Sequence, residues 1–399
     1  MKEFIYYGHI IIIGEGSTMK RELTGLLTVA MVFMIGMPVT AQDEWSPVVT
    51  GPIRIGVYLP MTGEVADYGK SAWEGIKAAN AMMPQLVGRE IKLVLADTKS
   101  DRTEAAKAVD SLIRWDKAVG IIGEAISSNS IAGGRVGERY QIPMVTPTAT
   151  NPLVTEGKRY YFRACFSDPL QGEIAAMLAL KTLGAKSAVA IVDITQDYCV
   201  GLGNYFVKSF LSKGGKVPFT AYIQTGEKDF RSQLALVQSV KPDMIYVPNY
   251  YTEVALLAKQ ARDLGINVPI VSGDAAQSAE LIKLGGKAVE GMYFTAHFAE
   301  AAVTTKLGKD ILAFYKKMYN KDLDGFGAMG ADAYFLLYDA MKRANSVEGP
   351  KVREALASTK DFNGVSGTIS LGDDGNAVKS AVINQVKDGK FVYVTSISP

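Results

Sequence analysis

Four polar residues in a row, Ser127, Ser128, Asn129 and Ser130, open a predicted helix and gather hydroxyl and amide groups in one place. Free backbone N–H groups at a helix N-terminus attract anions, and neighbouring hydroxyls add further donors. The segment therefore suits the carboxylate of a small ligand, with Ser127 as the candidate contact. Ordinary helix capping accounts for one such residue, and a solvated loop is the alternative interpretation.

Three threonines alternate along the next polar segment, at Thr146, Thr148 and Thr150. If this segment is extended, the three side chains point in one direction and offer hydroxyl donors. It follows a predicted strand, as the Ser127 segment does, and ligands lie at the carboxyl ends of strands in open α/β sheets. We therefore expect two donor-rich loops side by side. A proline-bounded turn with capping threonines is the alternative for this segment alone.

Tyrosines and one acid follow predicted strands in the second half of the chain, at Tyr198, Tyr250, Tyr251 and Asp274. The ring faces of tyrosine stabilise cations and form apolar walls, and an acid among them would hold an ammonium group. One half of the chain is thus predicted to bind a carboxylate and the other an amine. For any single tyrosine, plain packing is an equally valid explanation.

Residues 60–71 look at first like a phosphate-binding loop, but their spacing excludes that function. The motif needs four residues between its first glycine and the Gly-Lys pair, whereas five lie between Gly63 and Gly69. We interpret the segment instead as a turn whose Tyr68 faces a ligand cleft. Packing of Tyr68 within its own half is the alternative.

The sequence lacks the usual catalytic and cofactor-binding patterns. Its two histidines are His9 and His297, and no Gly-x-Ser-x-Gly motif or Cys/His cluster with metal-ligand spacing is present. The net charge of +2 and the mixing of basic with acidic residues give no nucleic-acid-binding stripe. We expect a binding protein with no cofactor, no metal and no nucleic-acid partner. Cys165 and Cys199 either form a disulfide or remain buried thiols.

Residues 1–41 read as an upstream extension followed by a secretory signal peptide. Met19-Lys20-Arg21 is a basic start, residues 23–37 carry no charge, and small residues precede a predicted cleavage after Ala41. An apolar run of this length is short for a spanning helix, which needs about 20 residues. Export to the periplasm is the expectation, and a retained membrane anchor is the alternative.

Short apolar runs alternate with amphipathic stretches over most of the remaining chain. This rhythm is typical of parallel sheets covered by helices on both faces. The predicted strands are residues 53–59, 91–97, 119–123, 142–146 and 160–164, then, after a break, 187–193, 217–223, 243–247, 268–272 and 291–295. The predicted helices include 70–82, 103–115, 304–320 and 330–345, and the tail reads as hairpins over 364–371, 381–387 and 391–397.

The order of several segments resembles the periplasmic leucine/isoleucine/valine-binding family, the substrate-binding proteins of branched-chain amino acid ABC transporters. The resemblance spans residues 53–395. It is carried by IGVYLPMTGEVADYG, ISSNS, PMVTPTATNPLVT, RACFSDPLQG, GEKDF and FNGVSGTISLGDDGNAVKSAVI. Together the order and spacing of these segments are specific.

The resemblance implies an α/β protein with two doubly wound parallel-sheet lobes joined by a multi-crossing hinge, the type I periplasmic binding protein fold. The N-terminal lobe would comprise residues 53–166 plus 298–377, and the C-terminal lobe residues 167–297 plus 378–399. A small amino-acid ligand would lie between the lobes, which close by hinge bending. The implied partner is the membrane permease of an ABC transporter, and the receptor would be a monomer.

By the same resemblance, Ser127, Thr148 and Thr150 grip the ligand carboxylate, and Asp274 takes the ammonium group. The remaining contacts come from the predicted pocket tyrosines, Tyr68, Tyr198 and Tyr250. The family has glutamate where this chain has Asp274, which puts leucine itself in question. A receptor for an amide, urea or an aromatic acid, or a sensor feeding a separate signalling partner, remains an alternative.

Overall fold

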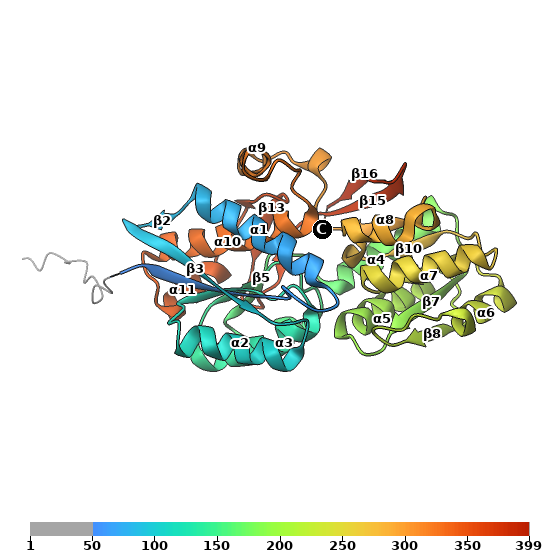
Figure 1. Cartoon of the computed structure of the whole chain (residues 1–399), viewed down its shortest axis with the longest axis horizontal. Helices are drawn as coiled ribbons and strands as arrows, with labels where there is room; N and C mark the ends of the chain where they lie inside the picture. Colours follow the sequence, from blue (N-terminus) through green and yellow to red (C-terminus); the bar gives the residue numbers. More distant parts are fainter. Residues whose placement is uncertain (1–50, 399) are drawn as a thin grey trace, which may run out of the picture. The chain divides into compact units, whose positions relative to one another are not determined.

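The computed structural model describes residues 51–398 (Figure 1). The predicted signal peptide and its cleavage after Ala41 lie outside these residues. Among the residues described, no helix is both long and apolar enough to cross a membrane. Residues 51–398 cluster as one compact unit.

The first sheet contains six strands in the order β2-β3-β1-β4-β5-β6, and all neighbours are parallel except β2 and β3. Its central strands are buried and mostly apolar, except for the exposed Arg54 near the start of β1, as expected when helices cover both faces. The strands are β1 (Ile53–Leu59), β2 (Gln85–Leu86), β3 (Arg89–Asp97), β4 (Gly120–Gly123), β5 (Met144–Thr146) and β6 (Tyr161–Arg163).

The second sheet contains seven strands in the order β16-β15-β11-β10-β9-β7-β8. The first five in chain order are parallel to one another, whereas β15 runs antiparallel to β11 and forms a hairpin with β16. The strands are β7 (Ala188–Asp193), β8 (Thr220–Ile223), β9 (Met244–Val247), β10 (Ile270–Ser272), β11 (Tyr293–Ala296), β15 (Ala381–Lys387) and β16 (Lys390–Ile397).

Helices pack on both sheets, and the chain passes between the sheets three times (Figure 1). Beside the first sheet lie α1 (Ala66–Met82), α2 (Arg102–Arg114), α3 (Ser127–Tyr140), α9 (Lys306–Tyr319), α10 (Gly325–Ala344) and α11 (Gly349–Ala357). Beside the second lie α4 (Asp168–Met177), α5 (Asp197–Ser212), α6 (Arg231–Val240), α7 (Tyr251–Asp263) and α8 (Ala279–Gly285). A small sheet of β12 (Phe362–Asn363), β13 (Thr368–Leu371) and β14 (Ala377–Val378) precedes the last passage.

Helices α1 and α10 cross closely because glycines line their contact. A Cβ atom built on Gly75 would lie 1.8 Å from the carbonyl oxygen of Gly327, and one on Gly330 would lie 2.4 Å from that of Ala72. The crossing therefore tolerates only hydrogen atoms at these positions. It fixes the N-terminal turns of both helices, and these turns carry Tyr68 and Phe326.

The α/β class and the strand pattern predicted from the sequence are confirmed, but some boundaries were wrong. Helix α10 begins at Gly325 rather than at residue 330, because Asp324 caps it by accepting a hydrogen bond from the Gly327 N–H (2.8 Å). Glycines in that first turn weakened the helical signal. The predicted strand at 364–371 is shorter, starting at Thr368, while the final hairpin turns at Asp388 as expected.

Candidate functional site

Six of the seven predicted site residues line a single pocket at the carboxyl ends of the strands. The pocket has a volume of about 10 Å³, roughly the room that one water molecule needs. The lining side chains must therefore move apart to admit an amino acid. The lining residues are Tyr68, Ala125, Ile126, Ser127, Thr148, Tyr198, Tyr250, Asp274, Ala275 and Phe326.

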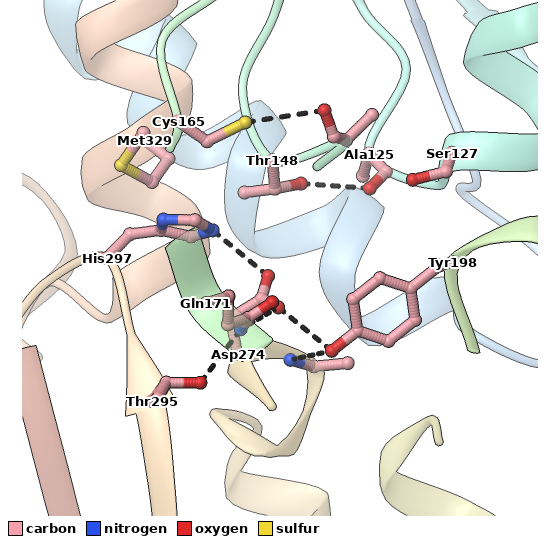
Figure 2. A network of polar contacts seen from close by, with 12 residues as sticks. Ala125, Ser127, Thr148, Cys165, Gln171, Tyr198, Asp274, Thr295, His297 and Met329 are labelled. Carbon is pink, nitrogen blue, oxygen red and sulfur yellow. Dashed lines mark hydrogen bonds and ion pairs between the residues drawn. The ribbon is translucent and has the colours of Figure 1, made fainter. Parts of the chain in front are cut away.

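Two hydroxyl groups from the loops that follow β4 and β5 lie at one side of this pocket, those of Ser127 and Thr148 (Figure 2). Ser127 is the first residue of α3, and its Oγ accepts a hydrogen bond from the Asn151 N–H (3.2 Å). The Thr148 hydroxyl donates to the Ala125 carbonyl (3.0 Å). The two polar loops thus lie against each other, as their places after neighbouring strands predicted.

Two of the other polar residues at this helix start serve the turn itself, whereas Ser128 Oγ accepts a hydrogen bond from the Asp197 N–H (3.0 Å) across the two sheets. Ser130 Oγ donates to the Glu124 carbonyl, and Asn129 Nδ2 to the Glu124 carboxylate. That carboxylate also accepts bonds from the Ile126 N–H and the Thr98 hydroxyl, while burial raises its pKa to about 7. Glu124 therefore fixes the turn that presents Ser127.

Thr150 is the predicted site residue that does not line the pocket. Its buried hydroxyl interacts with the buried carboxylate of Asp168, which has no other hydrogen-bond partner among residues 51–398. Burial raises the pKa of Asp168 to about 8. The segment bends at residues 147–148, and beyond the bend the buried guanidinium of Arg163 holds the carbonyls of Ala149 (2.9 Å) and Asn151 (3.0 Å).

Four aromatic rings form the apolar wall of the pocket. Tyr68 stacks on Phe326 with ring centroids 4.1 Å apart, and Tyr198 stacks on Tyr250 at 5.8 Å. The Tyr68 hydroxyl donates to the Ala275 carbonyl (2.5 Å), so that tyrosine offers its ring rather than its oxygen to the pocket. Burial raises the pKa of all three phenols, which stay uncharged.

Asp274 lies opposite the hydroxyl groups and begins a short 3-10 turn after β10 (Figure 2). Its Oδ1 accepts hydrogen bonds from Gln171 Nε2 (2.7 Å) and the Tyr198 hydroxyl (2.9 Å). Its Oδ2 lies 3.0 Å from Nε2 of His297. The carboxylate is thus buried and held by three donors before any ligand is considered.

Direct contacts bridge the loops of the two sheets around the pocket. Tyr68 links to both Ala275 and the Tyr251 N–H, and Ser278 Oγ donates to the Asp67 carboxylate (2.6 Å). On the other side, Asp197 pairs with the Arg102 guanidinium (3.0 Å), and its carbonyl accepts from Asn151 Nδ2 (2.6 Å). These hydrogen bonds and this ion pair within the chain therefore hold the pocket closed.

Sequence reasoning missed three side chains of this site. Phe326 lies before the predicted helix over 330–345, and no pattern in the sequence assigned it a role. Gln171 lies in the first turns of α4 and carries no pattern that marks it. His297 directly follows β11, and its position at the carboxyl end of a strand is the sequence signal that could have marked it.

The two cysteines are free and buried thiols, so the disulfide considered from the sequence is not formed. Cys165 Sγ lies 3.4 Å from the Ala149 carbonyl, behind Thr148 (Figure 2). Burial raises the pKa of this thiol to about 12, which keeps it protonated and unreactive.

Comparison with known proteins points in the same direction as this geometry. The profile of the periplasmic binding protein family matches residues 52–390. The Leu/Ile/Val-binding protein BraC3 of Rhizobium johnstonii is 30% identical over 360 residues, which cover 88% of this chain and 96% of that protein.

Two solved structures share the fold over almost their whole length. The leucine-binding protein LivK of Thermotoga maritima superposes with a TM-score of 0.85 at 43% identity, covering 87% of this chain and 99% of that one. The branched-chain amino acid transporter substrate-binding protein LivJ of Streptococcus pneumoniae, in complex with isoleucine, gives 0.82 at 29% identity, covering 87% and 100%.

Proposed function

This chain belongs to the periplasmic binding protein family, and from that premise we propose that it is the amino-acid receptor of an ABC uptake transporter. The observation that carries the proposal is the pocket, with hydroxyl donors at one side, a buried carboxylate at the other and aromatic rings between. A free α-amino acid with an apolar side chain has the complementary charges and surface. Its relatives named for leucine, isoleucine and valine support the branched-chain class.

We propose that the two sheets are the cores of two lobes, residues 53–166 plus 298–377 and residues 167–297 plus 378–399. The three passages between the sheets would form the hinge. A ligand that touches both lobes favours the closed form by the contacts that exist only there. Closure is then the signal for the permease, which this receptor would meet as a monomer in the periplasm after cleavage behind Ala41.

In this pocket Ser127 and Thr148 would bind the ligand carboxylate, and Asp274 the ammonium group. The rings of Tyr68, Tyr198 and Tyr250 would enclose the side chain. The protein would bind its ligand without transforming it.

A receptor for a ligand without an ammonium group is the second candidate. Asp274 already accepts hydrogen bonds from Gln171, Tyr198 and His297, so it needs no cationic partner to be satisfied. An amide, urea or an aromatic acid would then occupy the same pocket.

A thermal-shift screen separates these candidates. The protein from Gln42 onward is unfolded and refolded to remove bound ligand, and its Tm is measured with each amino acid, with amides and with aromatic acids. A ligand at 100 times its Kd stabilises the native state by about 2.7 kcal/mol. We expect leucine, isoleucine or valine to raise the Tm. A rise with an amide or aromatic acid alone would overturn the amino-acid assignment.

The carboxylate subsite is tested by Ser127→Ala, which should weaken binding of the responding amino acid about tenfold or more. A hydrogen bond to a charged group contributes about 1.5–3 kcal/mol. Ser212→Ala is the matched control, since that exposed hydroxyl at the end of α5 donates to the Ser209 carbonyl, outside the pocket. Calorimetry on Thr150→Ala decides the predicted role of that residue. A loss like that of Ser127 would keep it in the subsite, and wild-type affinity would remove it.

A further inference from the structure

His297 and Asp274 form a buried pair beside the proposed ligand site. The side chains are 4% and 5% exposed, and Nε2 lies 3.0 Å from Oδ2. The other oxygen of Asp274 is occupied by Gln171 and Tyr198, so the carboxylate is fixed in plane and direction. His297 follows β11, where the chain passes from the second sheet back to the first.

The surroundings of His297 favour its neutral form. Its ring packs on Phe166 with centroids 3.9 Å apart, and Nδ1 is buried with no hydrogen-bond partner in the described part of the chain. Lys379 adds a nearby positive charge, which opposes protonation, while Asp274 promotes it. Burial is the largest influence and lowers the pKa of His297 below its usual range.

The tautomer follows from these contacts. With the proton on Nε2, the ring donates to Asp274 and leaves the bare Nδ1 in its apolar contact. With the proton on Nδ1, a buried N–H would lack an acceptor and the Nε2 lone pair would face a carboxylate. The neutral Nε2–H form therefore satisfies the pair and leaves the negative charge of Asp274 uncompensated.

We propose that His297 is a positioning residue that orients Asp274 toward the ligand ammonium group, and that its protonation weakens ligand binding. This inference rests on the proposed function and goes beyond it by coupling the site to pH. An imidazolium beside Asp274 neutralises the carboxylate and places a like charge near the ammonium group. By linkage, a bound ammonium ligand makes His297 harder to protonate.

The direction of the pH effect follows because the protonated ring and the ligand ammonium group oppose each other. Above the pKa of His297 the ring is neutral and ligand affinity is highest. As the pH falls through that pKa the affinity drops, by at most about tenfold per pH unit for one proton. Isoleucine keeps both of its charges between pH 5 and 7.5, so the ligand itself does not contribute this slope. Burial also raises the pKa of Asp168 to about 8 and that of Glu124 to about 7, and both acids are unchanged in all variants compared below.

The first test observes the histidine directly and needs no ligand. His9 lies upstream of the predicted cleavage, so the protein from Gln42 onward contains one histidine and still includes the compact unit from residue 51. Imidazole nitrogen NMR over a pH series should show the neutral Nε2–H tautomer. Asp274→Asn should lower the pKa of His297 further, because the stabilising anion is lost. An Nδ1–H tautomer, or a pKa indifferent to Asp274, would overturn the proposal.

The second test measures the Kd for L-isoleucine by calorimetry between pH 5 and 7.5. Wild type should weaken as the pH falls through the pKa that NMR gives for His297, by at most about tenfold per pH unit below it, and the pH series is extended until that pKa is passed. His297→Gln keeps a side-chain N–H donor but cannot titrate, so its profile should lack the part of the slope that comes from His297. Its affinity should be higher than that of His297→Leu. A wild-type slope in His297→Gln would overturn the coupling. If wild type bound no amino acid at any pH, the proposed function would fail, and the NMR titration would still decide the pairing.

Discussion

Replacement of Asp274 by Asn should lower the affinity for the responding branched-chain amino acid about 100-fold or more. The carboxylate is buried opposite the hydroxyl groups of Ser127 and Thr148, so a ligand ammonium group would lose its charged partner in a site that excludes water. Removal of one member of a buried ion pair costs about 3–5 kcal/mol, and each 1.4 kcal/mol is tenfold in Kd. Calorimetry at pH 7.5 measures the change.

Asp193→Asn is the matched control for this substitution. Asp193 is also a buried acid at a strand end, but it bonds to Thr195 and Thr225 and does not line the pocket. Its replacement should leave the Kd within about threefold of wild type. Equal affinity in wild type and Asp274→Asn would show that the ligand carries no ammonium group at this position, and would favour the amide or aromatic-acid candidates.

Gly75→Val should destabilise the protein by about 3 kcal/mol or more and lower its Tm by about 6 °C or more. The added atoms would occupy the place of the Gly327 backbone, 1.8 Å from the Cβ position, so α1 and α10 must separate. The separation also splits the stacked Tyr68 and Phe326, so the remaining folded protein should bind its amino acid more weakly.

Lys70→Ala lies on the exposed face of the same helix and serves as the control. It should change the free energy of unfolding by no more than about 0.5 kcal/mol. Both variants are compared by thermal unfolding without ligand. A Tm for Gly75→Val equal to that of Lys70→Ala would mean that the glycine contact does not hold the two helices together.

The sequence was most informative where function depends on local order. Apolar runs without alternation located the parallel strands, and polar residues after those strands located the pocket. Ser127, Thr148, Tyr198 and Asp274 were found in this way, because parallel strands bring their carboxyl ends together whatever the details of packing.

What could not be predicted depends on contacts between distant segments. The partners of Asp274 lie 103 residues before it and 23 residues after it, at Gln171 and His297. The chain bends at residues 147–148 and is held beyond the bend by the buried Arg163, so the alternating threonines do not share one direction as far as Thr150. Glycines that favour a turn in isolation begin α10, since their small size lets it contact α1.

The contacts that bridge the two sheets have a consequence for how a transporter reads this receptor. Three contacts stabilise the closed pocket when no ligand is bound. They join Tyr68 to Ala275, Ser278 to Asp67, and Arg102 to Asp197. If the protein is the clamp proposed above, such contacts would keep part of the ligand-free population closed. A permease that recognises only the closed shape would then also bind receptors that carry no ligand.

The strength of these contacts would therefore set both the apparent affinity for ligand and the fraction of ligand-free receptor that is closed. Stronger contacts raise the closed fraction and with it the apparent affinity, because less of the binding free energy is used to close the clamp. They also raise the number of unloaded receptors that compete for the permease. Weaker contacts would lower the closed fraction of ligand-free receptor, and a higher ligand concentration would then be needed to close it.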